Sequence, residues 1–158
     1  MVENFVLKRM LVDDGSVVNL LTLKVYIALG LNPNKIRPVY TPLIRLVGKK
    51  VPIKGAADLI VELGDEEHVK RFRAEFMVID IPFSYNEIIR RPILYDIGAC
   101  TSIRFLIMKI PTEAGVAVVR GNQKEAREAY LCTLKDASQS LTVETLDVLK
   151  KVNTKPLD

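Results

Sequence analysis

Short apolar runs interrupted by turn-forming residues are the feature of this sequence that most restricts its fold. Runs such as LIVEL, EFMVIDI and VAVVR mix β-branched and other apolar residues, and glycine, proline or charged clusters separate them. Runs bounded in this way are typical of β-strands. Helical patterns are few. The order of elements therefore predicts a small, mostly β barrel or sandwich with short helices, and not an alternating β/α sheet.

The N-terminal segment predicts a strand that leads into an acidic turn. Residues 4–12 are mostly apolar, and Asp-Asp-Gly follows at residues 13–15. Ser16 is a suitable N-cap for a helix that ends at Gly30. The β-branched residues at the start of that helix also suit a strand, so the segment after Ser16 has two interpretations.

The rest of the chain predicts two hairpins and a short helix, followed by a further strand pair and a second helix. The predicted hairpins comprise residues 43–55, around Gly48, and the strand pair 57–63 and 73–81. Pro92 and Gly98 mark the start and end of the short helix. After it come strands at 102–110 and 116–121 and a helix that begins near Asn122 and Glu125, which have capping-box spacing.

Length and composition predict one folded domain with a tail. The chain has 158 residues, of which 49% are hydrophobic and 27% charged, a balance that can bury a core. We expect a domain over residues 1–121 and a C-terminal helix and linker tail over residues 122–158.

The start has no signal-peptide pattern and no apolar run is long enough to cross a bilayer, so we expect a soluble, intracellular, cytoplasmic protein without a membrane partner. Cys100 and Cys132 lack metal-site spacing, and we expect two buried thiols.

Several kinds of chemistry are disfavoured by the residues that are missing. His68 is the only histidine, so Ser/His and Cys/His catalytic pairs and histidine-rich metal sites are not expected. No phosphate-binding glycine loop is present. We therefore expect no metal and no cofactor. The basic cluster of His68, Lys70, Arg71 and Arg73 follows four acidic residues, so we interpret it as a solvated hairpin and do not expect a nucleic-acid partner.

The acidic turn is the candidate site for chemistry. In LVDDGSVVNLL an apolar strand leads into Asp13, Asp14, Gly15 and Ser16. Two aspartates held close together cannot both ionise, so they share a proton; one activates water and the other protonates a carbonyl oxygen. Glycine allows a tight turn beneath a substrate. Taken alone, the tetrapeptide is also compatible with an ordinary surface turn.

The segments around the tetrapeptide resemble a known protease family. LVDDGSVVNLL and TPLIRLVGKKVPIKG are similar to its active-site and flap segments. AEFMVIDIPFSYNEIIRRPIL is similar to its second strand pair and the following loop, and FLIMKIPTEAGVAVVRGNQKEAREAYL to the stretch that closes the domain. Together, residues 6–135 resemble the retropepsin-like aspartic protease domain in gag-pol polyproteins of plant gypsy-class retrotransposons with long terminal repeats.

This resemblance implies a fold, a reaction and a partner. The fold would be a closed retropepsin-like β-barrel with short helices, and the reaction would be aspartic endopeptidase hydrolysis of an extended peptide or polyprotein. Each chain would supply one catalytic aspartate, Asp13, so the active unit would be a homodimer. Leu46, Val47, Gly48 and Lys49 would form the flap tip, and Val51, Ile53 and Ile88 the substrate-pocket walls.

Two departures from the family pattern leave an alternative open. Asp14 occupies the place of a residue that usually carries a hydroxyl, and a carboxyl donates a hydrogen bond only when protonated. Arg90 stands where the family has glycine. A catalytically inactive remnant that acts as a binding or dimerisation module is therefore the alternative function. A second Asp-x-Gly-Ala string, at residues 96–99, is interpreted as a helix end and not as a second active-site loop.

Overall fold

The structure, a computed structural model, describes residues 1–40, 43–44, 50–82 and 84–131. The chain divides into two compact units, Met1–Asn122 and Gln123–Asp158. The described residues of the second unit form one helix, 123–131, which agrees with the helix predicted to begin near Asn122. No helix in the described residues is long and apolar enough to span a membrane.

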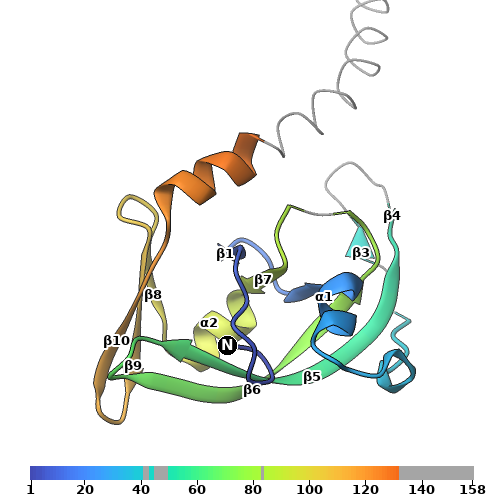
Figure 1. Cartoon of the computed structure of the whole chain (residues 1–158), viewed down its shortest axis with the longest axis horizontal. Helices are drawn as coiled ribbons and strands as arrows, with labels where there is room; N and C mark the ends of the chain where they lie inside the picture. The colour runs from blue at the N-terminus through green and yellow to red at the C-terminus, as the bar shows by residue number, and fades with distance from the viewer. Residues whose placement is uncertain (41–42, 45–49, 83, 132–158) are drawn as a thin grey trace, which may run out of the picture. The chain divides into compact units, whose positions relative to one another are not determined.

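In its described residues the first unit contains strands arranged in three sheets, together with two short α-helices and a 3-10 helix at Pro33–Lys35 (Figure 1). A five-stranded sheet has the order β1-β7-β2-β6-β5, a three-stranded sheet the order β10-β9-β8, and β3 pairs with β4. In the described part of the chain none of these sheets closes on itself, so the expected closed barrel was wrong. The elements are β1 (Met10–Asp13), β2 (Leu20–Thr22), α1 (Leu23–Ala28), β3 (Leu43–Ile44), β4 (Lys50–Val51), β5 (Ile53–Gly64), β6 (Val69–Ile79), β7 (Glu87–Arg90), α2 (Arg91–Asp96), β8 (Cys100–Ser102), β9 (Ile107–Thr112) and β10 (Gly115–Arg120).

The first strand is shorter than the sequence predicted. Residues 4–9 were expected to belong to it, but Asn4 and Arg9 have φ angles of 67° and 61°. These left-handed conformations interrupt an extended chain. β1 therefore begins at Met10 and pairs in parallel with β7, which brings Asp13 opposite Arg90.

Both interpretations of the segment after Ser16 were partly correct. The β-branched start leads into strand β2, which pairs in parallel with β6 and antiparallel with β7. A helix follows, but its N-cap is Thr22, whose hydroxyl accepts a hydrogen bond from the Val25 amide at 3.4 Å. Ser16 is therefore not the cap. Gly30 follows the helix with φ 74°, as its predicted role at the C-terminus requires.

The antiparallel hairpin of β5 and β6 is the longest element pair, and Figure 1 shows it running along one side of the unit. Its register shifts at Gly55, which has φ 147°. A methyl group on Gly55 would lie 2.1 Å from the carbonyl oxygen of Arg37, because Arg37 exchanges two backbone hydrogen bonds with Ala56. Only glycine fits this approach.

The strand predicted at residues 102–110 is a hairpin. β8 ends at Ser102, a turn follows, and β9 begins at Ile107. The turn contains no glycine, but Leu106 adopts φ 49°. The chain then folds back into β10 as predicted, with antiparallel β9–β10 pairing. Cys100 begins β8 and is exposed, so its expected burial was wrong, and Cys132 lies outside the described residues.

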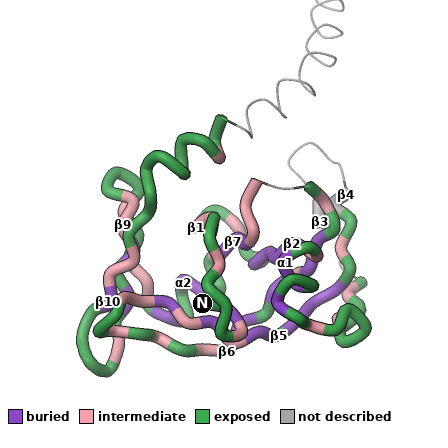
Figure 2. The backbone as a smooth tube through the Cα atoms, in the orientation of Figure 1, coloured by how far each residue is buried: buried purple, intermediate pink, exposed green. Residues whose placement is uncertain are grey.

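Buried apolar side chains form two clusters. Figure 2 shows where the buried residues lie along the backbone. The larger cluster includes Leu21, Phe76, Val78, Ile89 and Ile110, which are fully buried. The smaller one contains Leu20, Ile79 and Ile88. Neighbouring residues of one strand fall into different clusters because side chains alternate across a sheet. The five-stranded sheet thus has apolar contacts on both faces, and its smaller cluster lies on the face that carries the side chains of Asp13 and Arg90.

Candidate active site

The acidic turn begins where β1 ends. Asp13 is the last residue of the strand, and its Oδ1 accepts a hydrogen bond from the Gly15 amide at 3.0 Å. A methyl group on Gly15 would lie 3.2 Å from the same oxygen. Glycine therefore leaves room for the carboxylate to approach the turn. The side chain of Asp13 is 33% exposed, so solvent reaches it in a single protomer.

Residues that lie far along the chain hold this turn in place. The Arg91 guanidinium donates two hydrogen bonds, from Nε at 3.2 Å and Nη2 at 3.1 Å, to the carbonyl oxygen of Asp14. The Arg91 amide donates to the carbonyl of Ser16 at 3.1 Å. The junction of β7 and α2 thus fixes the backbone on both sides of Gly15, and the turn is not a free surface loop.

Asn19 is a buried polar residue that sequence reasoning missed. Its Oδ1 accepts a hydrogen bond from the Arg90 amide at 2.8 Å, and its Nδ2 donates to the Glu75 carbonyl at 3.1 Å. Asn19 is 5% exposed and so connects β6 and β7 beneath the acidic turn. Its signal in the sequence was one amide within the apolar run VVNLL.

Arg90 forms an ion pair with the candidate catalytic residue. Its Nε lies 3.3 Å from Oδ2 of Asp13, and its side chain is 18% exposed. Nε is shielded from solvent and has no hydrogen-bond partner among the described residues, so the contact is electrostatic. Burial lowers the pKa of Arg90, and the Asp13 carboxylate opposes that effect. The glycine-to-arginine departure thus places a cation directly against the candidate catalytic carboxylate.

The other predicted site residues lie in different environments. Ile88 is 3% exposed and belongs to the smaller apolar cluster, on the sheet face of Asp13. Ile53 is half-buried at the start of β5, opposite Ile79. Val51 lies in β4, but its side chain is outside the described part. The predicted flap tip, Leu46, Val47, Gly48 and Lys49, lies outside the described residues; the strands β3 and β4 on either side of it pair as a hairpin.

The second Asp-x-Gly-Ala string is a helix end, as predicted. Asp96 is the last residue of α2, Ile97 is its C-cap, and Gly98 adopts φ 66°. A methyl group on Gly98 would lie 3.2 Å from Pro111 of β9. The string therefore terminates a helix and packs against a neighbouring strand.

Glu87 is a second buried residue that the sequence did not single out. It is 4% exposed in β7, and its Oε2 has no hydrogen-bond partner among the described residues. Burial raises the pKa of Glu87 to about 7, while the positive charge of the N-terminus opposes the rise. A protonated, uncharged side chain is the form that such an environment favours.

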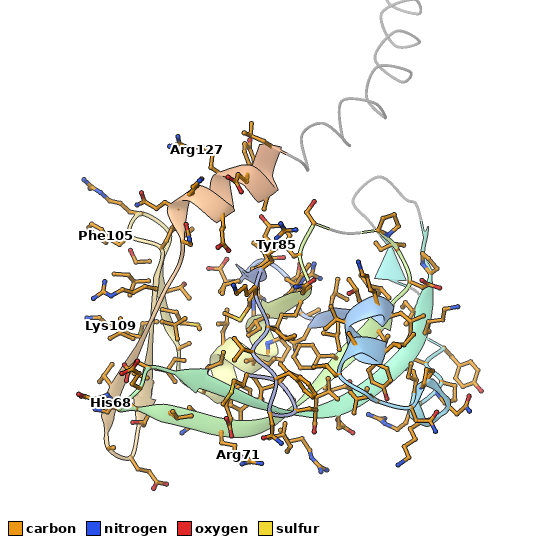
Figure 3. All side chains as sticks on the ribbon, viewed as in Figure 1. His68, Arg71, Tyr85, Phe105, Lys109 and Arg127 are labelled. Carbon is orange, nitrogen blue, oxygen red and sulfur yellow. The ribbon has the colours of Figure 1, made fainter. Side chains whose placement is uncertain are left out.

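Other polar clusters lie outside the acidic turn. A hollow of about 200 Å³ between the segment before β2, β6 and α2 is lined by Val18, Asn19, Arg73 and Asp96, among others, but not by Asp13. At the end of the β5–β6 hairpin, Asp65 accepts hydrogen bonds from the amides of Val118 and His68, and Figure 3 shows His68 beside the β9–β10 ribbon. No group of three or more metal-binding side chains occurs among the described residues.

Comparison with known proteins relates the fold to one class. No family model matches the chain, and no curated protein matches it. The chain is similar to the crystal structure of the retroviral protease-like domain of Ddi1 from Leishmania major, with a TM-score of 0.52 and 14% sequence identity, over 78% of this chain and 92% of that chain. At this identity the similarity concerns the fold alone. The chain therefore has a mostly β, retropepsin-like fold with few helices.

Proposed function

We propose that this chain is an aspartic endopeptidase domain of the retropepsin type, which cleaves an extended segment of a retrotransposon gag-pol polyprotein. The observation that carries the proposal is that hydrogen bonds hold the acidic turn in place. Asp13 ends β1 inside a retropepsin-like fold, and the Arg91 side chain donates a hydrogen bond to the backbone carbonyl of Asp14. An aspartate on a surface turn has no need of such anchors. Fixed geometry is what a catalytic carboxylate needs.

The proposed active unit is a homodimer in which two copies of Asp13 share one proton. The ionised copy takes a proton from water, and the water oxygen bonds to the scissile carbonyl carbon. The other copy donates its proton to the carbonyl oxygen. When the tetrahedral intermediate collapses, the carbon–nitrogen bond breaks, the first copy gives the proton that it took from water to the leaving nitrogen, and a hydroxyl of the intermediate returns its proton to the second copy. Peptide would bind as an added strand against the half-buried apolar side chain of Ile53, while Ile88, at 3% exposure, would support the sheet and not contact the peptide.

The ion pair between Arg90 and Asp13 favours a second candidate function. The Arg90 Nε lies 3.3 Å from Oδ2 of Asp13, on the carboxylate that would have to contact both the catalytic water and the second copy of Asp13. Asp14 adds one more carboxyl group per chain. The second candidate is therefore a catalytically inactive retropepsin-like module that binds peptide or dimerises.

A cleavage assay tests the first candidate. The full chain is incubated between pH 4 and pH 7 with a library of denatured protein fragments, and new termini are identified by mass spectrometry. We expect cleavage by the wild type and none by Asp13→Asn. Asp96→Asn is the matched control, because it changes the aspartate of the other Asp-x-Gly-Ala string and should leave cleavage unchanged. Sedimentation analysis of the same samples tests the dimer.

The same assay separates the two candidates. If wild type and Asp13→Asn are equally inactive, the endopeptidase proposal is wrong for this chain. The double variant Asp14→Thr, Arg90→Gly then tests the second candidate, because it removes the extra carboxyl and the cation. Cleavage that appears in the double variant, and disappears on adding Asp13→Asn, would identify these two residues as the cause of inactivity.

A further inference from the structure

We infer that Arg90 determines substrate specificity: its guanidinium receives the carboxylate of an acidic side chain, Asp or Glu, next to the scissile bond. The inference rests on the proposed function, because it requires peptide to bind over Asp13. Arg90 lies beside Asp13 in the candidate site, and its Nε makes no hydrogen bond to the Asp13 carboxylate.

The position of Arg90 makes it available to a peptide at Asp13. Parallel pairing of β1 with β7 sets the two residues side by side, and both side chains project from the sheet face that carries Leu11 and Ile88. With 18% of its side chain exposed, Arg90 is reachable but mostly desolvated. A ligand that contacts the Asp13 carboxylate thus comes within reach of the guanidinium.

The contact with Asp13 uses one edge of the Arg90 guanidinium. A guanidinium carries five N–H donors, and the ion pair that the described residues show for Arg90 is the 3.3 Å approach of Nε to Asp13. Arg91 does not compete for the same anion, because its own guanidinium is bound to the Asp14 carbonyl. Burial has already lowered the pKa of Arg90, so its charge is held at a cost. A planar carboxylate that binds the guanidinium through two hydrogen bonds offsets that cost.

Peptide binding tests the inference without relying on cleavage. Asp13→Asn full-length protein is titrated calorimetrically with terminally blocked apolar peptides that differ only in a central Glu or Gln, and with the Gln peptide carrying a free C-terminal carboxylate. The Glu peptide is expected to bind about tenfold more tightly than either Gln peptide, the effect of a charge-assisted hydrogen bond. In Asp13→Asn, Arg90→Gln the preference should disappear. Arg104→Gln, an exposed arginine that lies over Phe105, is the matched control and should keep it.

The outcomes distinguish this inference from the proposed function. Equal affinity for the blocked Glu and Gln peptides, or a preference for the free C-terminus alone, overturns the assignment to Arg90 and leaves the endopeptidase proposal standing. An Arg90-dependent Glu preference without cleavage by the wild type supports the inference and overturns the endopeptidase activity. Absence of binding by every peptide overturns the inference, and the cleavage assay alone then decides the proposed function. If Arg90→Gln does not fold, Arg90→Lys replaces it, and a preference at least several-fold weaker than with arginine is expected, because lysine lacks the planar fork.

Discussion

Replacing Glu87 by glutamine is expected to change how the stability of the domain depends on pH. Burial raises the pKa of this carboxyl from an ordinary 4.5 to about 7. Between these two values the folded chain binds a proton that the unfolded chain has released. The free energy of unfolding therefore falls as the pH rises: the contribution is complete below pH 4.5 and is lost as the pH passes through about 7.

The size of the effect follows from the shift in pKa. One unit corresponds to about 1.4 kcal/mol, so the ionisation of Glu87 lowers the stability of the wild type by about 3 kcal/mol between pH 4.5 and pH 8. Glutamine resembles the protonated side chain and does not titrate. Glu87→Gln should thus match the wild type near pH 4.5 and exceed its stability by about 3 kcal/mol at pH 8.

Urea unfolding followed by circular dichroism, at fixed protein concentration over this pH range, measures the difference. Glu66→Gln is the matched control, since Glu66 is exposed in the turn of the β5–β6 hairpin. That control should follow the wild type at every pH. If the stability of Glu87→Gln runs parallel to that of the wild type across the range, the reasoning from burial is refuted.

Three further substitutions test other contacts. Asn19→Ala leaves the Arg90 amide without its acceptor and should lower the free energy of unfolding in urea by about 1–3 kcal/mol; an unchanged value would contradict the role of the amide. The hydrogen bond from the Val118 amide is the main cause that lowers the pKa of Asp65 from 3.8 to about 2. The ionised Asp65 carboxylate should therefore protect this amide from hydrogen exchange above pH 3.8, and the protection should be lost as the pH falls through about 2. In Asp65→Ala the Val118 amide should exchange rapidly at neutral pH, and continued protection would disprove the contact. Gly55→Ala forces a methyl group within 2.1 Å of a backbone oxygen and should cost at least about 2 kcal/mol in thermal unfolding; an unaltered melting temperature would exclude strain at this position.

Elements with local signals were predicted well from the sequence. Pro92 and Gly98 bracket α2 because proline fits the first helical turn and glycine adopts the left-handed conformation after the last one. The β9–β10 hairpin follows equally from its turn residues. These features depend on backbone preferences of a few neighbouring residues, and such preferences can be recognised without knowledge of the rest of the fold.

Elements that depend on unusual backbone conformations or distant partners were not predictable in the same way. The conformations of Asn4, Arg9 and Leu106 interrupt segments whose composition resembles a strand. Thr22, and not Ser16, caps α1 because β2 pairs with two distant strands and takes up the first part of the helical pattern. The closed barrel was inferred from resemblance, and strand pairing across the described sheets decided otherwise.

In the candidate site, too, some individual residues could be recognised from the sequence, whereas the contacts between distant residues could not. The tetrapeptide at residues 13–16 and the unusual Arg90 are visible in the sequence. Their contact is not, because it depends on parallel pairing of two strands that lie far apart along the chain. Asn19 is a polar residue inside the apolar run VVNLL, a signal that indicates burial but does not identify its partners, whereas Glu87 follows Asn86 and has no such signal.

The hydrogen bonds from Arg91 to the acidic turn can form only late during protein synthesis. The Arg91 side chain that holds Asp14 lies 77 residues further along the chain. A nascent chain therefore displays Asp13 on the ribosome long before β7 and α2 have emerged to orient it. The turn acquires its shape only when most of the domain has been translated, and a truncated product that stops before β7 carries the aspartate without the scaffold that positions it.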